Sequence, residues 1–404
     1  MKRYRLYIWT TCLLAVIGLM TACSSDGADG LLEEQKTMQE SVRTADYLNV
    51  RIVSGSSQPT RATEQEENAI YDGILAIFEG SAANNATLKT AVVIDQLINN
   101  PGSGTSVNIT QRLASGTHPY ADSKRYVLAL LNTTATGFTV EGSMLRHNGT
   151  SLAGKTIADI QSLIINGVGC ADEHAGFYMA STIKSDGNIL RLVEDKYLYD
   201  TPKAAAAGNM LPIEVERAAA KVWVSLAADV PTLSLYVNRA TTATTFKVHS
   251  MRWVPDRYKT VCYALRNSAS ASVALNSYDA TDFTNYWEHA YSSGDEVYVA
   301  ENDETAADSQ TRVIVCLRLK DSSNILLSTF YIYDGDKTRI FTTPAQAEAY
   351  VGTGFDAAKL TQYENGRIYD AYDILHDSDK KLERNNSYHL TLKTLTELGN
   401  NTAP

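Results

Sequence analysis

Short stretches in which apolar and polar residues alternate recur along most of this chain. In residues 47–53, Leu48, Val50 and Ile52 fall on one face of an extended segment. The residues between them form the other face: Tyr47, Asn49 and Arg51. A period of two is the signature of a strand with one buried face. The sequence therefore predicts a first strand here and a second over residues 70–80, which ends at a glycine turn.

Residues 81–210 mix strand and helix patterns. Residues 124–132, KRYVLALLN, contain an apolar run from Tyr126 to Leu131 and predict a strand. Residues 156–166 instead place their apolar side chains at helical spacing: Ile157, Ile160, Leu163 and Ile164. A few helices inserted among many strands indicate a β-sandwich with additional elements.

The composition changes near Pro212, where a second series of short strands begins. Turn sequences such as DGDK and ENG separate these strands at the spacing typical of an all-β sandwich. Strands and helices do not alternate regularly, so a doubly wound parallel sheet is not expected. The pattern predicts a domain boundary between residues 210 and 211.

The first residues have the character of a targeting segment. Lys2, Arg3 and Arg5 precede an apolar run over residues 6–20, which is shorter than the roughly 20 residues of a spanning helix. The run leads into Met-Thr-Ala-Cys, which resembles a bacterial lipobox and predicts a diacylated Cys23 after removal of residues 1–22. The alternative is a plain secretory signal.

Two cysteines of the mature region lie in apolar, strand-like runs. With Cys12 in the signal and Cys23 lipidated, three cysteines remain, so no closed disulfide framework is predicted. We interpret Cys262 and Cys316 as small buried hydrophobic residues.

Length and charge restrict the classes of function. The 404 residues suffice for two domains that each bury a core. The formal net charge is −10, without a basic stripe, which argues against nucleic acid as a partner and against charge-driven binding to an anionic membrane.

The sequence contains no catalytic, phosphate-binding or metal-binding motif in a context that supports its function. The cluster of Cys170, Asp172, Glu173 and His174 has no second cluster to complete a metal site. No nucleophile, phosphate or zinc motif occurs, so we expect neither an enzyme nor a cofactor or metal. Residues 285–293 gather Tyr286, Trp287 and Tyr291, which are candidates for ligand contact, although aromatic residues of a β-protein more often form the core.

Several segments, in a fixed order, resemble the fimbrillins, the subunits of type V pili of anaerobic Gram-negative bacteria. They are VERAAAKV, VHSMRWVPD, YVAEN, TRVIVCLRL, YENGRIYDAYDI and ERNNSYHLTLKTLTELG. The resemblance implies two Greek-key β-sandwich domains of transthyretin-like topology and a precursor anchored in the outer membrane by its lipid. It also implies assembly with other fimbrial subunits by donor-strand exchange, after an arginine-specific surface protease has cut behind the first strand.

Arg61 and Ala62 occupy the place of that cut. Arg51 lies inside the first strand, and Arg43 precedes it. The resemblance then divides the chain into a signal (residues 1–22), a propeptide with the first strand (23–61), and two domains (62–210 and 211–404). Removing the strand of Leu48, Val50 and Ile52 would leave an apolar groove with unpaired backbone groups, which is a template for a strand of another subunit.

The C-terminal residues affect the expected role. Shaft subunits of the family carry a further alternating strand after the final Leu-Gly, but only NNTAP follows Gly399. A donor strand of about eight residues cannot be built from these, so we expect a tip subunit that accepts a strand, with adhesion to a surface ligand. The alternatives are a shaft subunit that donates residues 388–398, a base anchor that keeps its lipid, and an uncleaved glycan-binding lipoprotein.

Overall fold

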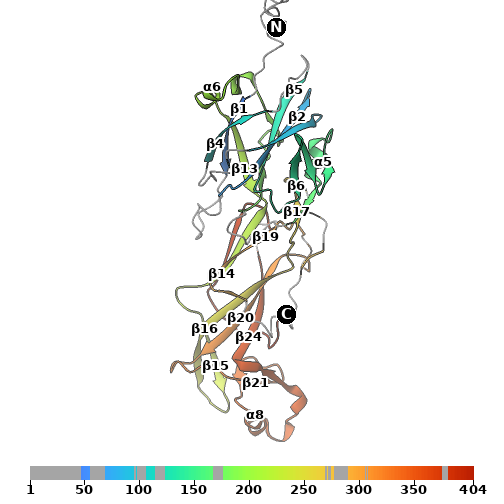
Figure 1. The fold of residues 1–404 in the computed structure, drawn as a ribbon. Helices are drawn as coiled ribbons and strands as arrows, with labels where there is room; N and C mark the ends of the chain where they lie inside the picture. Colours follow the sequence, from blue (N-terminus) through green and yellow to red (C-terminus); the bar gives the residue numbers. More distant parts are fainter. Residues whose placement is uncertain are drawn as a thin grey trace, which may run out of the picture.

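The protein is an elongated molecule in which two strand-rich units follow one another along its length (Figure 1). The computed structural model describes residues 47–54, 69–94, 97, 106–113, 123–166, 176–268, 271, 274–276, 290–304, 306, 308–374 and 381–404. Strands dominate, and the helices are short. The all-β fold class with a few inserted helices is confirmed.

A nine-stranded sheet forms the first unit. Its main path, in sheet order, is β12 (Leu198–Tyr199), β1 (Tyr47–Ser54), β13 (Leu211–Arg217), β10 (Met179–Ser181), β5 (Lys124–Leu131), β2 (Gly73–Gly80) and β3 (Thr87–Val93). Two more strands pair beside this path, β4 (Ser106–Arg112) on β1 and β11 (Arg191–Leu192) on β5. β1, the first strand of the described residues, is therefore not at an edge of the sheet.

Both faces of this sheet are buried, and β5 shows why its sequence is apolar throughout. Tyr126, Leu128 and Leu130 enter one hydrophobic cluster, whereas the residues between them enter another: Val127, Ala129 and Leu131. The second cluster also takes side chains from β1, β2, β4, β10 and β13, so the sheet curls around it. A strand that is buried on both faces has no side toward solvent, so its apolar residues do not alternate with polar ones.

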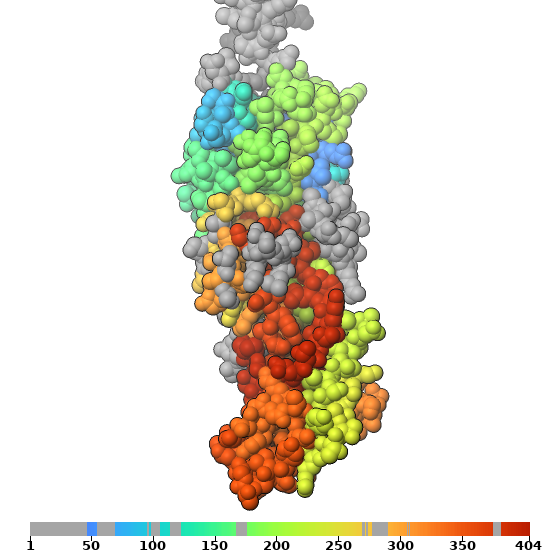
Figure 2. Space-filling model, turned by 180° about the vertical axis from the view of Figure 1, so that it is seen from behind, coloured from blue at the N-terminus to red at the C-terminus, as the bar shows by residue number. Residues whose placement is uncertain are grey.

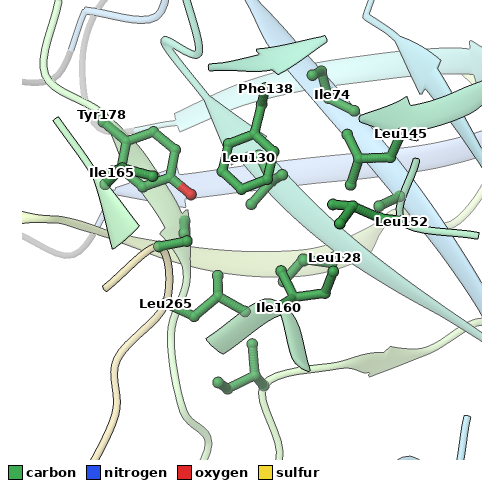
Figure 3. Close-up of a cluster of buried hydrophobic side chains, with 14 of the residues drawn as sticks. Ile74, Leu128, Leu130, Phe138, Leu145, Leu152, Ile160, Ile165, Tyr178 and Leu265 are labelled. Carbon is green, nitrogen blue, oxygen red and sulfur yellow. The ribbon is translucent and has the colours of Figure 1, made fainter. Parts of the chain in front are cut away.

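Smaller elements cover the other cluster. The three-stranded sheet of β6 (Phe138–Glu141), β7 (Met144–His147) and β8 (Thr150–Ser151) contributes Phe138 and Leu145, and α5 (Ile157–Gln161) contributes Ile160. Figure 3 shows these side chains beside Leu128 and Leu130 of β5. Leu265, from the second unit, belongs to the same cluster, so this core extends into the junction between the units.

Residues 156–166, predicted as one helix, form two elements. Thr156 and Asp159 make a capping box that starts α5, but the helix ends at Gln161 and the chain continues as β9 (Ile164–Ile165), which pairs with β17 (Cys262–Tyr263). Tertiary pairing with the second unit overrides the helical spacing of the apolar residues.

The second unit is a sandwich of two sheets around one core. One sheet has the order β19 (Glu296–Ala300), β14 (Ala219–Leu226), β25 (Ser387–Leu392). The other has β22 (Arg339–Ile340), β15 (Thr232–Val237), β16 (Ala243–Asp256), β20 (Arg312–Lys320) and β24 (Arg367–Asp373), with β18 (Tyr291–Ser292) on β16. Inward side chains of both sheets form one hydrophobic cluster, among them Val222, Trp253 and Val315.

The remaining elements lie beside these sheets or at their ends. β21 (Phe330–Tyr333) and β23 (Leu360–Tyr363) pair antiparallel as a two-stranded sheet. The helices are α6 (Pro202–Ala206) and α8 (Pro344–Val351), with short 3-10 turns η1 (Asp195–Tyr197), η3 (Gly352–Gly354), η4 (Ala357–Lys359) and η5 (Glu364–Gly366). Both α6 and α8 start at a Thr-Pro pair, with the threonine as N-cap and the proline in the first turn.

One nearly continuous run of strand carries the chain from the first unit into the second. The strand β13, expected in the second domain, pairs with β1 and β10 in the first sheet. The next strand, β14, begins directly after Ala218. The change of sheet thus comes several residues after the expected boundary between residues 210 and 211. The composition change near Pro212 marks the start of β13, not the passage between units.

Candidate functional site: the first strand and its groove

β1 lies in a slot between strands that are distant from it in sequence. On one side it pairs antiparallel with β4, from Tyr47 opposite Arg112 to Val53 opposite Ser106. On the other side its first residues pair with β12, and Val50–Ser54 run parallel to β13. Both backbone edges of β1 are therefore used within the sheet.

The apolar face of β1 is completely enclosed. Leu48, Val50 and Ile52 are each 0% exposed, as the alternation predicts. They belong to the same hydrophobic cluster as Ile109 of β4 and Ile213 of β13. Fully burying such a side chain stabilises a fold by roughly 1.5–3 kcal/mol, so β1 contributes a substantial part of the first unit's core.

β4 depends on β1. Among the residues that the structure describes, β1 is the only strand with which β4 forms a ladder. Without β1, β4 would keep the hydrophobic contacts of Ile109 and its contact with α6 but lose its strand partner. Loss of β1 would thus leave free edges on β4, on β13 and on the short β12.

The second face of β1 is not uniformly exposed, which the sequence pattern did not indicate. Arg51 is exposed, but Asn49 is only 1% exposed. Its side-chain Nδ2 donates to the carbonyl oxygen of Ala205 at 2.6 Å. The short helix α6 and the residues after it therefore cover this end of β1. The Thr201-Pro202 start of α6 is readable from sequence, whereas its position against a strand about 150 residues earlier is not.

Several predicted site residues lie outside the described residues: Cys23, Arg61, Ala62, Tyr286 and Trp287, and also Cys170, Asp172, Glu173 and His174. Of the proposed aromatic contacts, Tyr291 is described. It is 37% exposed on β18, with its ring 5.2 Å from that of the buried Trp253. The structure therefore locates one of the three aromatic residues.

The C-terminal residues are packed against their own unit. Leu398 is 0% exposed, and Asn400 and Tyr369 exchange backbone hydrogen bonds of 2.6 and 2.8 Å. The hydroxyl of Tyr363 donates to the Gly399 carbonyl at 2.9 Å. A Cβ at Gly399 would come within 2.3 Å of the Tyr369 carbonyl oxygen, so this close approach requires glycine. Figure 2 shows the C-terminal part of the chain, in dark red, along the middle of this face.

Buried ion pairs lie where the two units meet. Glu216 of β13 accepts hydrogen bonds from Arg266, and Glu301 accepts one of 2.8 Å from Nε of Arg384. Arg384 is 1% exposed. Burial lowers the pKa of its guanidinium, but the hydrogen bonds and charge of Glu301 outweigh burial and raise it above the ordinary value. The Glu216–Arg266 pair ties the end of β13 to the second unit, whereas Glu301 and Arg384 pair within the second unit.

The two described cysteines are free and buried, which confirms their interpretation as small hydrophobic residues. Burial raises the pKa of Cys262 to about 12 and that of Cys316 to about 11, so neither is a thiolate nucleophile at neutral pH. Among the described residues, no three His, Cys, Asp or Glu side chains come together as metal ligands. In the same part of the chain, no helix has the length and apolar character needed to span a membrane.

No protein-family model matches the chain, and no curated protein matches it. Solved structures do. A fimbrilin from Porphyromonas gingivalis W83 is 16% identical with a TM-score of 0.45, over 88% of this chain and 92% of that one. The C-terminally truncated tip fimbrial protein Mfa3 from Porphyromonas gingivalis is 10% identical with a TM-score of 0.38, over 87% and 97%.

A fimbrial assembly protein from Parabacteroides distasonis ATCC 8503 is 12% identical with a TM-score of 0.40, over 87% of this chain and 93% of that one. Each similarity extends over most of both chains. All three of those proteins are fimbrial proteins.

Proposed function

We propose that this protein is a subunit of a cell-surface fimbrium, and that β1 occupies a groove which a strand of another subunit later fills. The arrangement of β1 carries this proposal. It lies inside the sheet, with Leu48, Val50 and Ile52 fully buried. Its only covalent connection to the rest of the described fold runs through residues 55–68, which include Arg61.

Cleavage after Arg61 would convert β1 from a covalent part of the sheet into a bound peptide. Once it leaves, β4 and β13 present unpaired N–H and C=O groups beside pockets for alternate side chains. An extended segment that enters such an edge gains backbone hydrogen bonds and buries its own aliphatic residues. At roughly 1.5–3 kcal/mol for each of three aliphatic side chains, capture of a strand is strongly favourable.

The same cut would separate the lipid from the folded subunit. Cys23, the expected lipid attachment site, precedes Arg61. A precursor held in the outer membrane by this lipid would be released into the growing fimbrium together with the loss of β1. One proteolytic step thereby couples release from the membrane to opening of the groove.

A tip position, with adhesion to a surface ligand, is the finer part of the proposal. A donor strand must be able to leave its own domain. The buried Leu398, the backbone bonds of Asn400 to Tyr369 and the close approach of Gly399 hold these C-terminal residues in place, which supports a subunit that accepts a strand. The shaft alternative requires β25 to leave β14 and expose Tyr388, now 4% exposed.

The processing step is tested on the full precursor with an arginine-specific protease and mass spectrometry of the products. We expect a chain that begins at Ala62, because Arg61 follows the strand that must be removed. Arg61→Ala should abolish this product, whereas the control Arg43→Ala should leave it unchanged. The same product pattern from the wild-type and Arg61→Ala chains would contradict the proposal.

A further inference from the structure

Asn49 lies in a buried polar site within the groove. Its Nδ2 is 2.6 Å from the carbonyl oxygen of Ala205 and 3.4 Å from those of Gly208 and Asn209. We call these three oxygens the carbonyl cradle. On the other side of the carboxamide, the hydroxyl of Thr110 donates to Oδ1 of Asn49 at 3.4 Å. Every element of this site except Asn49 itself belongs to the part of the fold that remains when β1 leaves.

The carbonyl cradle accepts hydrogen bonds and donates none. A carboxamide supplies two N–H donors to it and one oxygen to Thr110, which matches both sides of the site. An ionised aspartate has nearly the same shape but only acceptor atoms, so it would place negative charge against three carbonyl oxygens. A leucine would bury these carbonyls without a donor at this position.

The cradle is held in place by hydrogen bonds that do not involve Asn49. Thr201 caps α6 by accepting from the backbone N–H of Ala204 at 3.2 Å. The N–H of Gly208 donates to Ala205 at 3.0 Å, and the hydroxyl of Tyr199 donates to the Asn209 carbonyl at 3.2 Å. Since these bonds join residues 199–209 to one another, an incoming strand meets carbonyl groups that already have partners within their own segment.

We infer that the carbonyl cradle selects the incoming strand for a carboxamide at the position of Asn49. This inference rests on the proposed replacement of β1. The partner is a strand of another polypeptide in which an asparagine stands between the first two of three alternate aliphatic residues. The position of Arg51, on the same face but exposed, imposes no such requirement.

The test uses the full chain, cleaved after Arg61 in the presence of excess fluorescent peptide that spans residues 46–54. Uptake is followed by fluorescence anisotropy and by mass spectrometry of the native complex. The compared peptides are the unchanged sequence, Asn49→Asp, Asn49→Leu, Arg51→Leu as the matched exposed control, and Val50→Asp.

We expect Asn49→Asp and Asn49→Leu to bind about tenfold or more weakly than the unchanged peptide, since each leaves buried polar groups unmatched. Arg51→Leu should bind within about twofold. Equal binding of the unchanged, Asn49→Asp and Asn49→Leu peptides, together with no binding of the Val50→Asp peptide, would refute selection by the cradle. Uptake of a strand by the groove would still hold. If the unchanged peptide itself does not enter, the proposed function fails instead.

Discussion

At the scale of single residues, buried charged side chains are found at the junction of the two units and not on the strand that is proposed to be replaced. Arg384 is buried at the junction and bound by Glu301, whose side chain is 11% exposed. In contrast, β1 has no charge on its buried face. A strand that leaves the protein and is replaced encounters no buried ion pair to break, whereas separation of the two units would break the Glu216–Arg266 pair.

We therefore predict that Glu301→Gln destabilises the protein strongly. The substitution keeps the shape of the side chain but leaves the buried guanidinium of Arg384 without its countercharge, which costs about 3 kcal/mol. Chemical denaturation of the full chain followed by tyrosine and tryptophan fluorescence measures the change.

The matched control is Asp334→Asn, since Asp334 and Lys359 form a pair in which both side chains are roughly half exposed (60% and 46%). This control should change the free energy of unfolding by less than about 1 kcal/mol. Similar effects of the two substitutions would contradict a structural role for the junction pair.

At the scale of elements, both units use the same arrangement around the central run of strand. β1 lies parallel to β13 in the first unit, and β25 lies parallel to β14 in the second. β4 occupies a different position, because β1 is its ladder partner within the described residues. β4, with the short β12, thus depends most directly on the occupant of the groove for its order.

This dependence predicts a local change in backbone protection. After cleavage and removal of the peptide, amide protons of β4 should exchange with solvent much faster, because their hydrogen-bonding partner is gone. Amides of β2 and β5, which pair with each other over Gly73–Gly80 and Lys124–Leu131, should change little. Hydrogen exchange with mass spectrometry distinguishes the segments, and re-addition of the residue 46–54 peptide should restore β4. Equal protection of β4 before and after removal would refute this dependence.

The sequence predicts elements better than their partners. The alternation of Leu48, Val50 and Ile52 locates β1 and its buried face, because side-chain direction in a strand follows from position alone. Nothing local indicates that β1 pairs with β13 or that α6 buries Asn49. Those contacts join segments more than 150 residues apart, and they depend on how the whole sheet closes. The apolar run of β5 was similarly readable as a strand, but burial of both its faces follows from the two clusters around it.

At the scale of the whole molecule, the proposed groove and the packed C-terminal residues lie in different units. The groove is in the first unit, beside β13, whereas in the second unit Leu398 is buried in the core and Gly399 and Asn400 are held against Tyr369 of β24. In the shaft alternative, the second unit of one molecule would release β25 into the first unit of the next. The contacts of the C-terminal residues oppose that release.

The cleaved protein alone should therefore remain monomeric, even at high concentration, in light scattering and in gels that preserve strand-exchanged complexes. Gly399→Ala sharpens this test, because the added Cβ would meet the Tyr369 carbonyl at 2.3 Å and displace the C-terminal residues from their site. If these residues were a donor strand held in reserve, the variant would form ladders of multimers. An acceptor at the tip stays monomeric in both forms and still takes up the residue 46–54 peptide. Ladders from either cleaved chain would favour the shaft role, because only a subunit that also donates a strand can polymerise with itself.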